Sequence, residues 1–67
     1  MLLSLDNRKI YFDLVWLGRI SAMRGERDSA RAYYERALAV GEAEGDASGV
    51  AEARSLIRAL AEKPASQ

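Results

Sequence analysis

The chain has 67 residues, and its 10 Lys and Arg balance its 10 Asp and Glu, so the formal net charge is zero. We expect residues 1–67 to form a single domain, and a domain of about 60 residues buries only about 60% of the surface that its unfolded chain exposes. Because Cys and His are both absent, disulfides and thiolate metal sites are excluded and the commonest general base is missing. A neutral chain also argues against nucleic acid as the main partner.

Membrane association is not expected either. The unbroken apolar stretches are no longer than Leu14-Val15-Trp16-Leu17, whereas a helix that crosses a bilayer needs ~20 apolar residues. The N-terminal segment lacks the basic region of a signal peptide, and its apolar run ends early. We therefore expect a soluble, cytoplasmic protein with no membrane partner.

The predicted elements are three helices, at about residues 6–24, 28–44 and 48–63, followed by a frayed tail at 64–67. Ala, Leu, Arg and Glu dominate the chain, and all four are good helix formers. The alternation of apolar and polar residues that is typical of strands is missing. The sequence therefore predicts an all-α fold.

Glycines and a polar cap separate the predicted helices. Gly25 suits the left-handed position that follows the first helix, and Gly45 suits the end of the second. Asp46 or Ser48 caps the third helix, and Pro64 ends it.

The first predicted helix differs from the other two because it has two apolar stripes. One consists of Ile10, Leu14, Leu17 and Ser21, the other of Phe12, Trp16, Ile20 and Met23, with Tyr11, Val15 and Ala22 near the seam. A helix that is apolar on most sides packs between neighbours on both sides. The other two helices have one apolar stripe each, so they are too few to cover both stripes of the first.

A series of large and small residues crosses the first two helices: Leu17-Gly18, Gly25, Ala30, Tyr34 and Ala37-Leu38. This order resembles the tetratricopeptide repeat, in which large and small residues alternate between two antiparallel helices. Leu14 stands where that family often has Trp. The resemblance implies an antiparallel helical hairpin over about residues 11–44, followed by a third helix, as in a fragment of an α-solenoid with about one and a half repeats.

The repeat period that the resemblance implies is longer than the standard one. Leu17 and Ile57 lie 40 residues apart, whereas the standard repeat has about 34 residues, so the chain is similar to variants with an extended second helix. Ser21, Glu42 and Arg58 stand where the family has an apolar residue, a proline and a glycine. The third helix is therefore interpreted either as the start of a second repeat or as a cap.

The second apolar stripe predicts a surface for a protein partner. The resemblance implies a concave inner surface at Phe12, Val15, Trp16, Arg19, Ala22 and Met23, which nearly coincides with that stripe. We expect Leu14, Leu17, Tyr34, Leu38, Ile57 and Leu60 to fill the core. We therefore predict a partner-binding surface at Phe12, Val15, Trp16, Arg19, Ile20 and Met23.

The sequence leaves several candidates for the partner that covers this surface. The leading hypothesis is a second copy of the chain, in a homodimer or a larger assembly; repeats cannot bury their faces alone, and about three are needed for stability. Alternatives are a peptide or helix of another protein, a neighbouring repeat of a longer array, and the core of the monomer itself. A helix-turn-helix nucleic-acid binder would need a basic third helix, but Arg54 and Arg58 are balanced there by Glu52 and Glu62.

Catalytic chemistry has little support in the sequence. No Gly-rich phosphate loop follows a strand, and no Ser has a His partner. Glu42, Glu44 and Asp46 place three carboxylates near one loop, but the alternating oxygen ligands and closing Glu of an EF-hand are absent. We interpret this segment as a solvated acidic loop, and we expect no enzymatic activity, no metal site and no cofactor.

Overall fold

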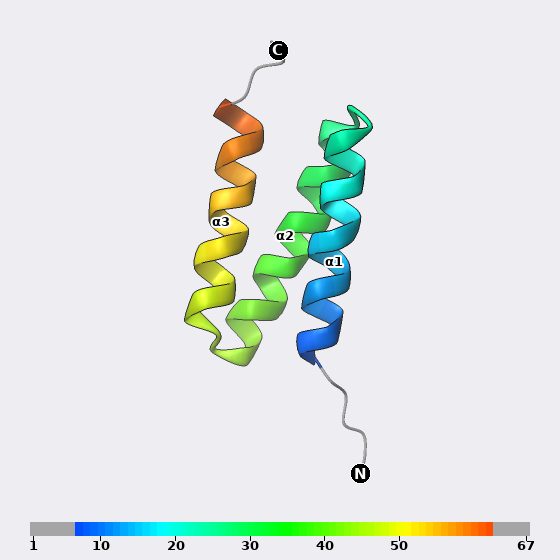
Figure 1. Cartoon of the computed structure of the whole chain (residues 1–67). Coiled ribbons are helices and arrows are strands. Elements are labelled where there is room, and N and C mark those ends of the chain that lie inside the picture. The colour runs from blue at the N-terminus through cyan, green and yellow to red at the C-terminus, as the bar shows by residue number, and fades with distance from the viewer. Residues whose placement is uncertain (1–6, 63–67) are drawn as a thin grey trace.

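The computed structural model describes residues 7–62, which form three α-helices and no strand. Helix α1 spans Asn7–Met23, α2 spans Arg27–Glu44 and α3 spans Ala47–Glu62. Figure 1 shows that α2 runs antiparallel to both α1 and α3, so α1 and α3 point in the same direction. The all-α prediction is confirmed, and the helix ends within the described range lie within one residue of the predicted ones.

Some predicted boundaries cannot be compared with the structure. The predicted start at residue 6, the predicted end at residue 63 and the frayed tail at 64–67 lie outside the described residues. Within the described range, none of the helices is both long and apolar enough to cross a bilayer.

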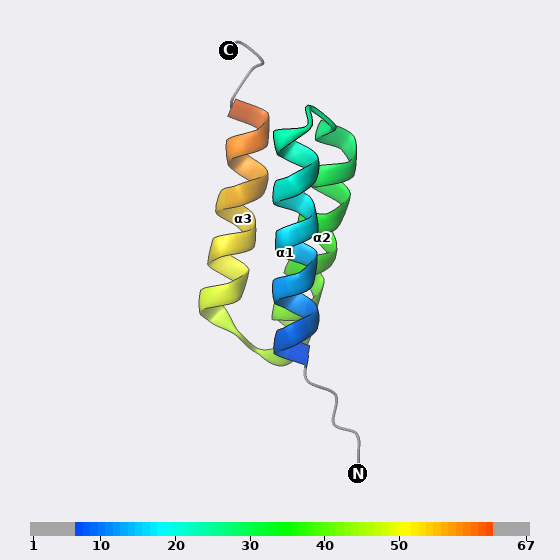
Figure 2. The same cartoon turned by 45° about the vertical axis from the view of Figure 1, so that its right-hand side comes forward.

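The start of α1 and the turn between α2 and α3 lie at the same end of the molecule (Figures 1 and 2). This arrangement follows from the antiparallel order and the short connections between the helices. It brings the first turns of α1 beside the first turns of α3, although the two segments are about 40 residues apart in the sequence.

Both turns use the glycines that the sequence singled out. Gly25 has φ +80° and Gly45 has φ +69°, a left-handed conformation that side chains with a Cβ disfavour. The amide of Asp46 donates to the carbonyl of Gly41 at 2.9 Å, which closes the end of α2. The carboxylate of Asp46 accepts the amide of Gly49 at 3.0 Å, so Asp46 caps α3 as predicted.

Small residues let α1 and α2 approach closely. Ala30 and Ala37 are fully buried, and Tyr34 is only 3% exposed. A Cβ at Gly18 would lie 2.5 Å from Cε1 of Tyr34, well inside van der Waals contact, so the absence of a side chain at position 18 makes room for the Tyr34 ring. The spacing of small and large residues therefore has the packing role that the sequence predicted.

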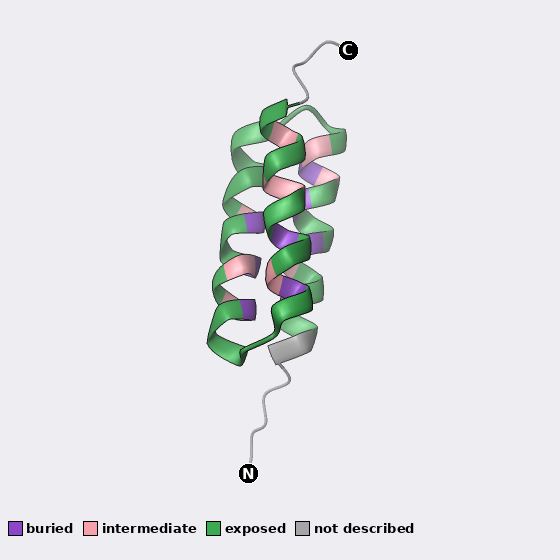
Figure 3. Cartoon of the chain, turned by 90° about the vertical axis from the view of Figure 1, so that its left-hand side faces the viewer, coloured by how far each residue is buried: buried purple, intermediate pink, exposed green. Residues whose placement is uncertain are grey.

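The centre of the core differs from the prediction. Its buried members are Tyr11, Val15, Ala37 and Ala53, and Leu14, Leu38, Val40 and Leu56 pack against them. Leu17, which was expected inside, is 41% exposed, and Ile57 and Leu60 are only partly buried. In Figure 3 the buried positions lie along the sides of the helices that face one another. On α1 this side is the seam between the two stripes, because Tyr11, Val15 and Gly18 recur at helical spacing.

The close packing of Gly18 against Tyr34 can be tested by substitution. Overpacking costs about 1–3 kcal/mol, and Ala regains about 1 kcal/mol of helix propensity over Gly. We therefore expect Gly18→Ala to lower the free energy of unfolding by up to about 2 kcal/mol, measured by urea denaturation with circular dichroism. In a Tyr34→Leu background the same change should be neutral or stabilising, because the ring is gone; an equal loss in both backgrounds contradicts the packing described.

Candidate interaction surface

The large apolar side chains that the described residues expose all lie on α1. They are Ile10 (43% exposed), Phe12 (63%), Trp16 (63%), Leu17 (41%) and Met23 (84%). Single exposed apolar residues are common on protein surfaces, whereas a contiguous apolar patch marks an interaction site. The concentration of these residues on one helix is therefore the feature that identifies the candidate site.

The helical period gathers three of these residues on one side of α1. Phe12, Trp16 and Met23 stand at i, i+4 and i+11, so their side chains share one face, and Ile20, partly buried, borders it. We refer to Phe12, Trp16, Ile20 and Met23 as the α1 face. Ile10 and Leu17, seven residues apart, lie on another side of α1, about 140–160° around the helix from Phe12 at 100° per residue.

The structure separates the predicted partner-binding residues into two groups. Phe12, Trp16, Arg19 and Met23 are exposed, and Ile20 is partly buried at their edge. Val15 is different: it is only 6% exposed and belongs to the core. Its assignment to the partner-binding surface is corrected, because Val15 lies on the side of α1 that faces the other helices. A partner-binding role for the remaining residues stays a prediction.

Tyr11 connects the α1 face to α3. Its hydroxyl lies 2.9 Å from the carbonyl oxygen of Gly49 and 3.0 Å from Oε1 of Glu52, and its single proton can be donated to either acceptor. The ring of Tyr11 also meets the ring of Phe12 edge-on, with centroids 5.6 Å apart. These contacts hold Phe12 beside the start of α3.

Burial and neighbouring carboxylates change the acidity of this hydroxyl. Burial is the largest cause, followed by the hydrogen bond to Glu52 and the negative charges of Glu52 and Asp46. Together they raise the pKa of Tyr11 from 10.0 to about 12. Tyr11 was expected only near the seam between the two stripes. Its spacing of four and seven residues from Val15 and Gly18 is the sequence signal that identifies it as a core residue.

A hollow of about 300 Å³ opens between α1 and α3 at this point. Its lining consists of Tyr11, Phe12, Asp46, Ser48, Gly49 and Glu52. One wall is aromatic and comes from α1, and the other carries carboxylates from the start of α3. The hollow thus extends the α1 face towards α3 and adds negative charge to it.

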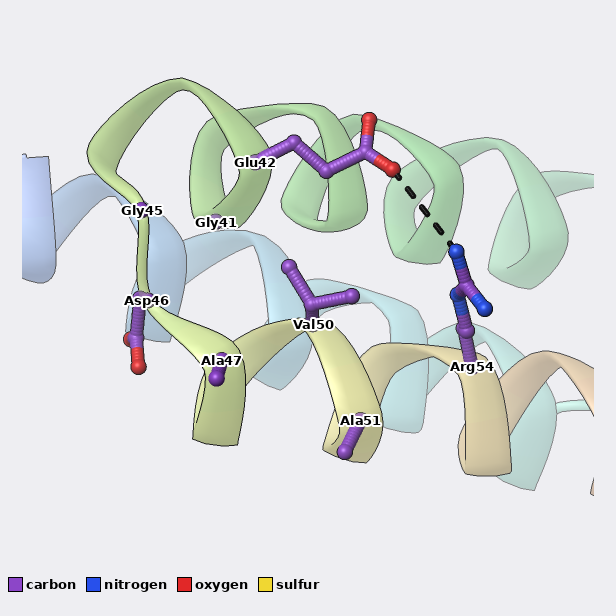
Figure 4. A pocket seen from close by; sticks show the side chains of 8 residues that line it. All are labelled: Gly41, Glu42, Gly45, Asp46, Ala47, Val50, Ala51 and Arg54. Carbon is purple, nitrogen blue, oxygen red and sulfur yellow. Dashed lines mark ion pairs between the residues drawn. The ribbon is translucent and has the colours of Figure 1, made fainter.

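A second hollow, of about 460 Å³, lies between the end of α2 and the start of α3 (Figure 4). Val50 points towards Gly41 in this view, and the carboxylate of Asp46 points away. Glu42 Oε2 and Arg54 Nη2 approach to 4.0 Å across its rim, and both side chains are exposed. An ion pair of this kind contributes at most about 1 kcal/mol.

The acidic loop that the sequence analysis considered is used by the fold itself. Asp46 caps α3 and Glu42 pairs with Arg54. Among the described residues, no three side chains of the metal-ligating types come together.

No protein-family model, no curated protein and no solved structure matches the chain.

The raised pKa of Tyr11 predicts alkaline destabilisation. Below pH 10 the hydroxyl is protonated in both folded and unfolded chains, so its contribution is complete. Between pH 10 and about 12 the unfolded chain ionises first, and stability falls, by on the order of 2 kcal/mol.

Thermal unfolding followed by circular dichroism from pH 8 to pH 11.5 checks this. Tyr11→Phe should make the alkaline decline shallower but not abolish it, because burial also raises the pKa of Tyr34, and Tyr33→Phe should leave the decline unchanged. An equal decline in the Tyr11→Phe variant would show that the hydroxyl is not in the environment described.

Proposed function

We propose that the chain is a small helical protein–protein interaction module of the tetratricopeptide type, which associates with a second copy of itself through the α1 face. The observation that carries the proposal is the gathering of all the large exposed apolar side chains of the described residues on α1. No catalytic residue or cofactor enters the proposal.

The packing of α1 on α2 supports the tetratricopeptide-like character. Small residues stand where the helices touch, at Gly18, Ala30 and Ala37, and the Tyr34 ring fills the space between them. Tyr11, Gly49 and Ala53 join α3 to the pair in the manner of a following first helix. These contacts support the resemblance because small residues stand where the helices touch and a large ring fills the space between them, as the tetratricopeptide pattern implies.

The amount of exposed apolar surface supports association. Large apolar side chains carry on the order of 200 Å² each, so the exposed fractions of Phe12, Trp16 and Met23 present on the order of 400 Å² per copy. A stable interface buries about 800 Å² per partner, with a polar rim around an apolar centre. The α1 face supplies about half of that area as an apolar centre, and the polar rim supplies the rest.

The location of the surface supports a closed pair. A chain of copies needs two complementary apolar surfaces, whereas a two-fold dimer needs only one. Within residues 7–62, α2 and α3 expose no large apolar side chain, and the outer side of α3 presents Arg58 and Glu62. Because the largest exposed apolar side chains share the α1 face, a dimer through this one face is favoured over a filament.

The test is the molar mass by light scattering across a dilution series, with Trp16 emission followed in parallel. We expect a dimer that dissociates on dilution while the emission shifts to the red, because Trp16 is 63% exposed in the single chain. A folded monomer at every concentration would overturn self-association. If its red emission then shifts to the blue only with an added protein, the α1 face binds a different partner.

Substitutions locate the surface. Trp16→Ala should weaken association by about 30-fold or more, as expected for a central aromatic residue. Tyr33→Ala, on α2 and away from the α1 face, should change it less than threefold. Circular dichroism verifies that both variants are folded, and equal effects would mean that the α1 face is not the interface.

A further inference from the structure

We infer that two copies pair their α1 helices antiparallel about Trp16, so that Arg19 of each copy binds Glu52 on α3 of the other. This inference rests on the proposed function and adds an orientation and a charge contact to it.

Two charged side chains of opposite sign border the α1 face, Arg19 on α1 and Glu52 on α3. Arg19 follows Phe12 by seven residues, or two turns, so it lies on the side of α1 that borders α3. Glu52 lines the hollow from α3, beside Phe12. Both side chains are exposed, and Arg19 forms no ion pair with another residue of the described range. The surface therefore carries a donor and an acceptor for the same kind of contact.

Arg19 and Glu52 are too far apart along the helices to meet within one chain. The Tyr11 hydroxyl lies 3.0 Å from Glu52, which places this carboxylate near the level of Tyr11. Arg19 stands eight residues further along α1, and a rise of about 1.5 Å per residue separates the two levels by roughly 12 Å.

A two-fold axis at the level of Trp16 removes this separation. Arg19 is three residues beyond Trp16, and Tyr11 is five residues before it. In an antiparallel pair, Arg19 of the second copy is therefore brought to within roughly 3 Å of the level of Tyr11 in the first. That offset is less than one helical turn, about 5.4 Å, and an Arg side chain spans it.

The charges also select the direction of pairing. An axis perpendicular to the α1 helices keeps both α3 helices on the same side of the pair, so Arg19 faces α3 of the other copy. An axis parallel to the α1 helices places the α3 helices on opposite sides, and Arg19 then meets the Ile20 edge of the other α1. Only the antiparallel pair brings Arg19 of each copy to Glu52 of the other. The two-fold symmetry therefore produces this ion pair twice.

Charge exchange between two variants tests this arrangement. Arg19→Glu alone and Glu52→Arg alone should each weaken the homodimer about tenfold or more, because like charges then meet at two places. An equimolar mixture of the two variants should form a heterodimer with two attractive contacts, because one contact keeps its original polarity and the other is restored with reversed polarity. Native mass spectrometry distinguishes it by the mass difference between the variants.

The control is Glu62→Arg, which makes the same charge change on the outer side of α3. It should leave the homodimer intact, and it should not rescue Arg19→Glu in a mixture. If Glu52→Arg does not fold by circular dichroism, Glu52→Gln keeps an acceptor for the Tyr11 hydroxyl, and its dimer should lose part of the salt dependence that the natural sequence shows.

The outcomes separate this inference from the proposed function. If the natural sequence forms a dimer that Trp16→Ala weakens, but neither charge variant weakens it and their mixture gives only a statistical proportion of heterodimer, the pairing described here is wrong and self-association stands. If the natural sequence forms no dimer at all, both fail.

Discussion

The contact between Gly18 and the ring of Tyr34 sets the arrangement of the whole domain. A methyl group at position 18 would overlap that ring, so α1 and α2 pack closely only at this register and rotation. Once α1 is fixed in this orientation, Tyr11 and Val15 face inward, where Tyr11 meets the start of α3. The same rotation turns Phe12, Trp16 and Met23 outward, where the three helices cannot cover them. The fold and the candidate interface are thus two results of one helix–helix contact.

The elements of the fold were predictable because their signals are local. Gly25, Gly45 and the Asp46 cap mark the ends of the helices within a few residues of sequence, and the spacing of Gly18 and Tyr34 indicates which positions approach closely. The core of α1 was less predictable. Two apolar stripes and a seam are visible in the sequence, but periodicity does not say which arc the other helices cover. That choice depends on a contact between residues 16 positions apart, so Leu17 was expected inside and Val15 outside, the reverse of the structure.

The candidate site was predicted by comparing the two apolar stripes of α1 with the single stripe that each of the other two helices offers to cover them. Phe12, Trp16 and Met23 were predicted to be in excess of the core and are exposed. Tyr11, which joins the site to α3 through a buried hydroxyl, was placed only near the seam, because its spacing from Val15 and Gly18 was not weighed against the two longer apolar stripes. The acidic residues of the second turn lack the EF-hand ligand pattern, and two of them serve the fold through a cap and an ion pair.

The thin core has a consequence for the abundance of the protein. No large side chain is fully buried among the described residues, and a domain of about 60 residues has only a small core. In the proposed dimer, association would add free energy in proportion to the logarithm of protein concentration relative to Kd. The melting temperature should therefore rise with concentration, and at low expression the chain should be degraded faster than at high expression. The exposed apolar side of α1 would thus make the lifetime of the protein depend on the concentration of the protein in the cell.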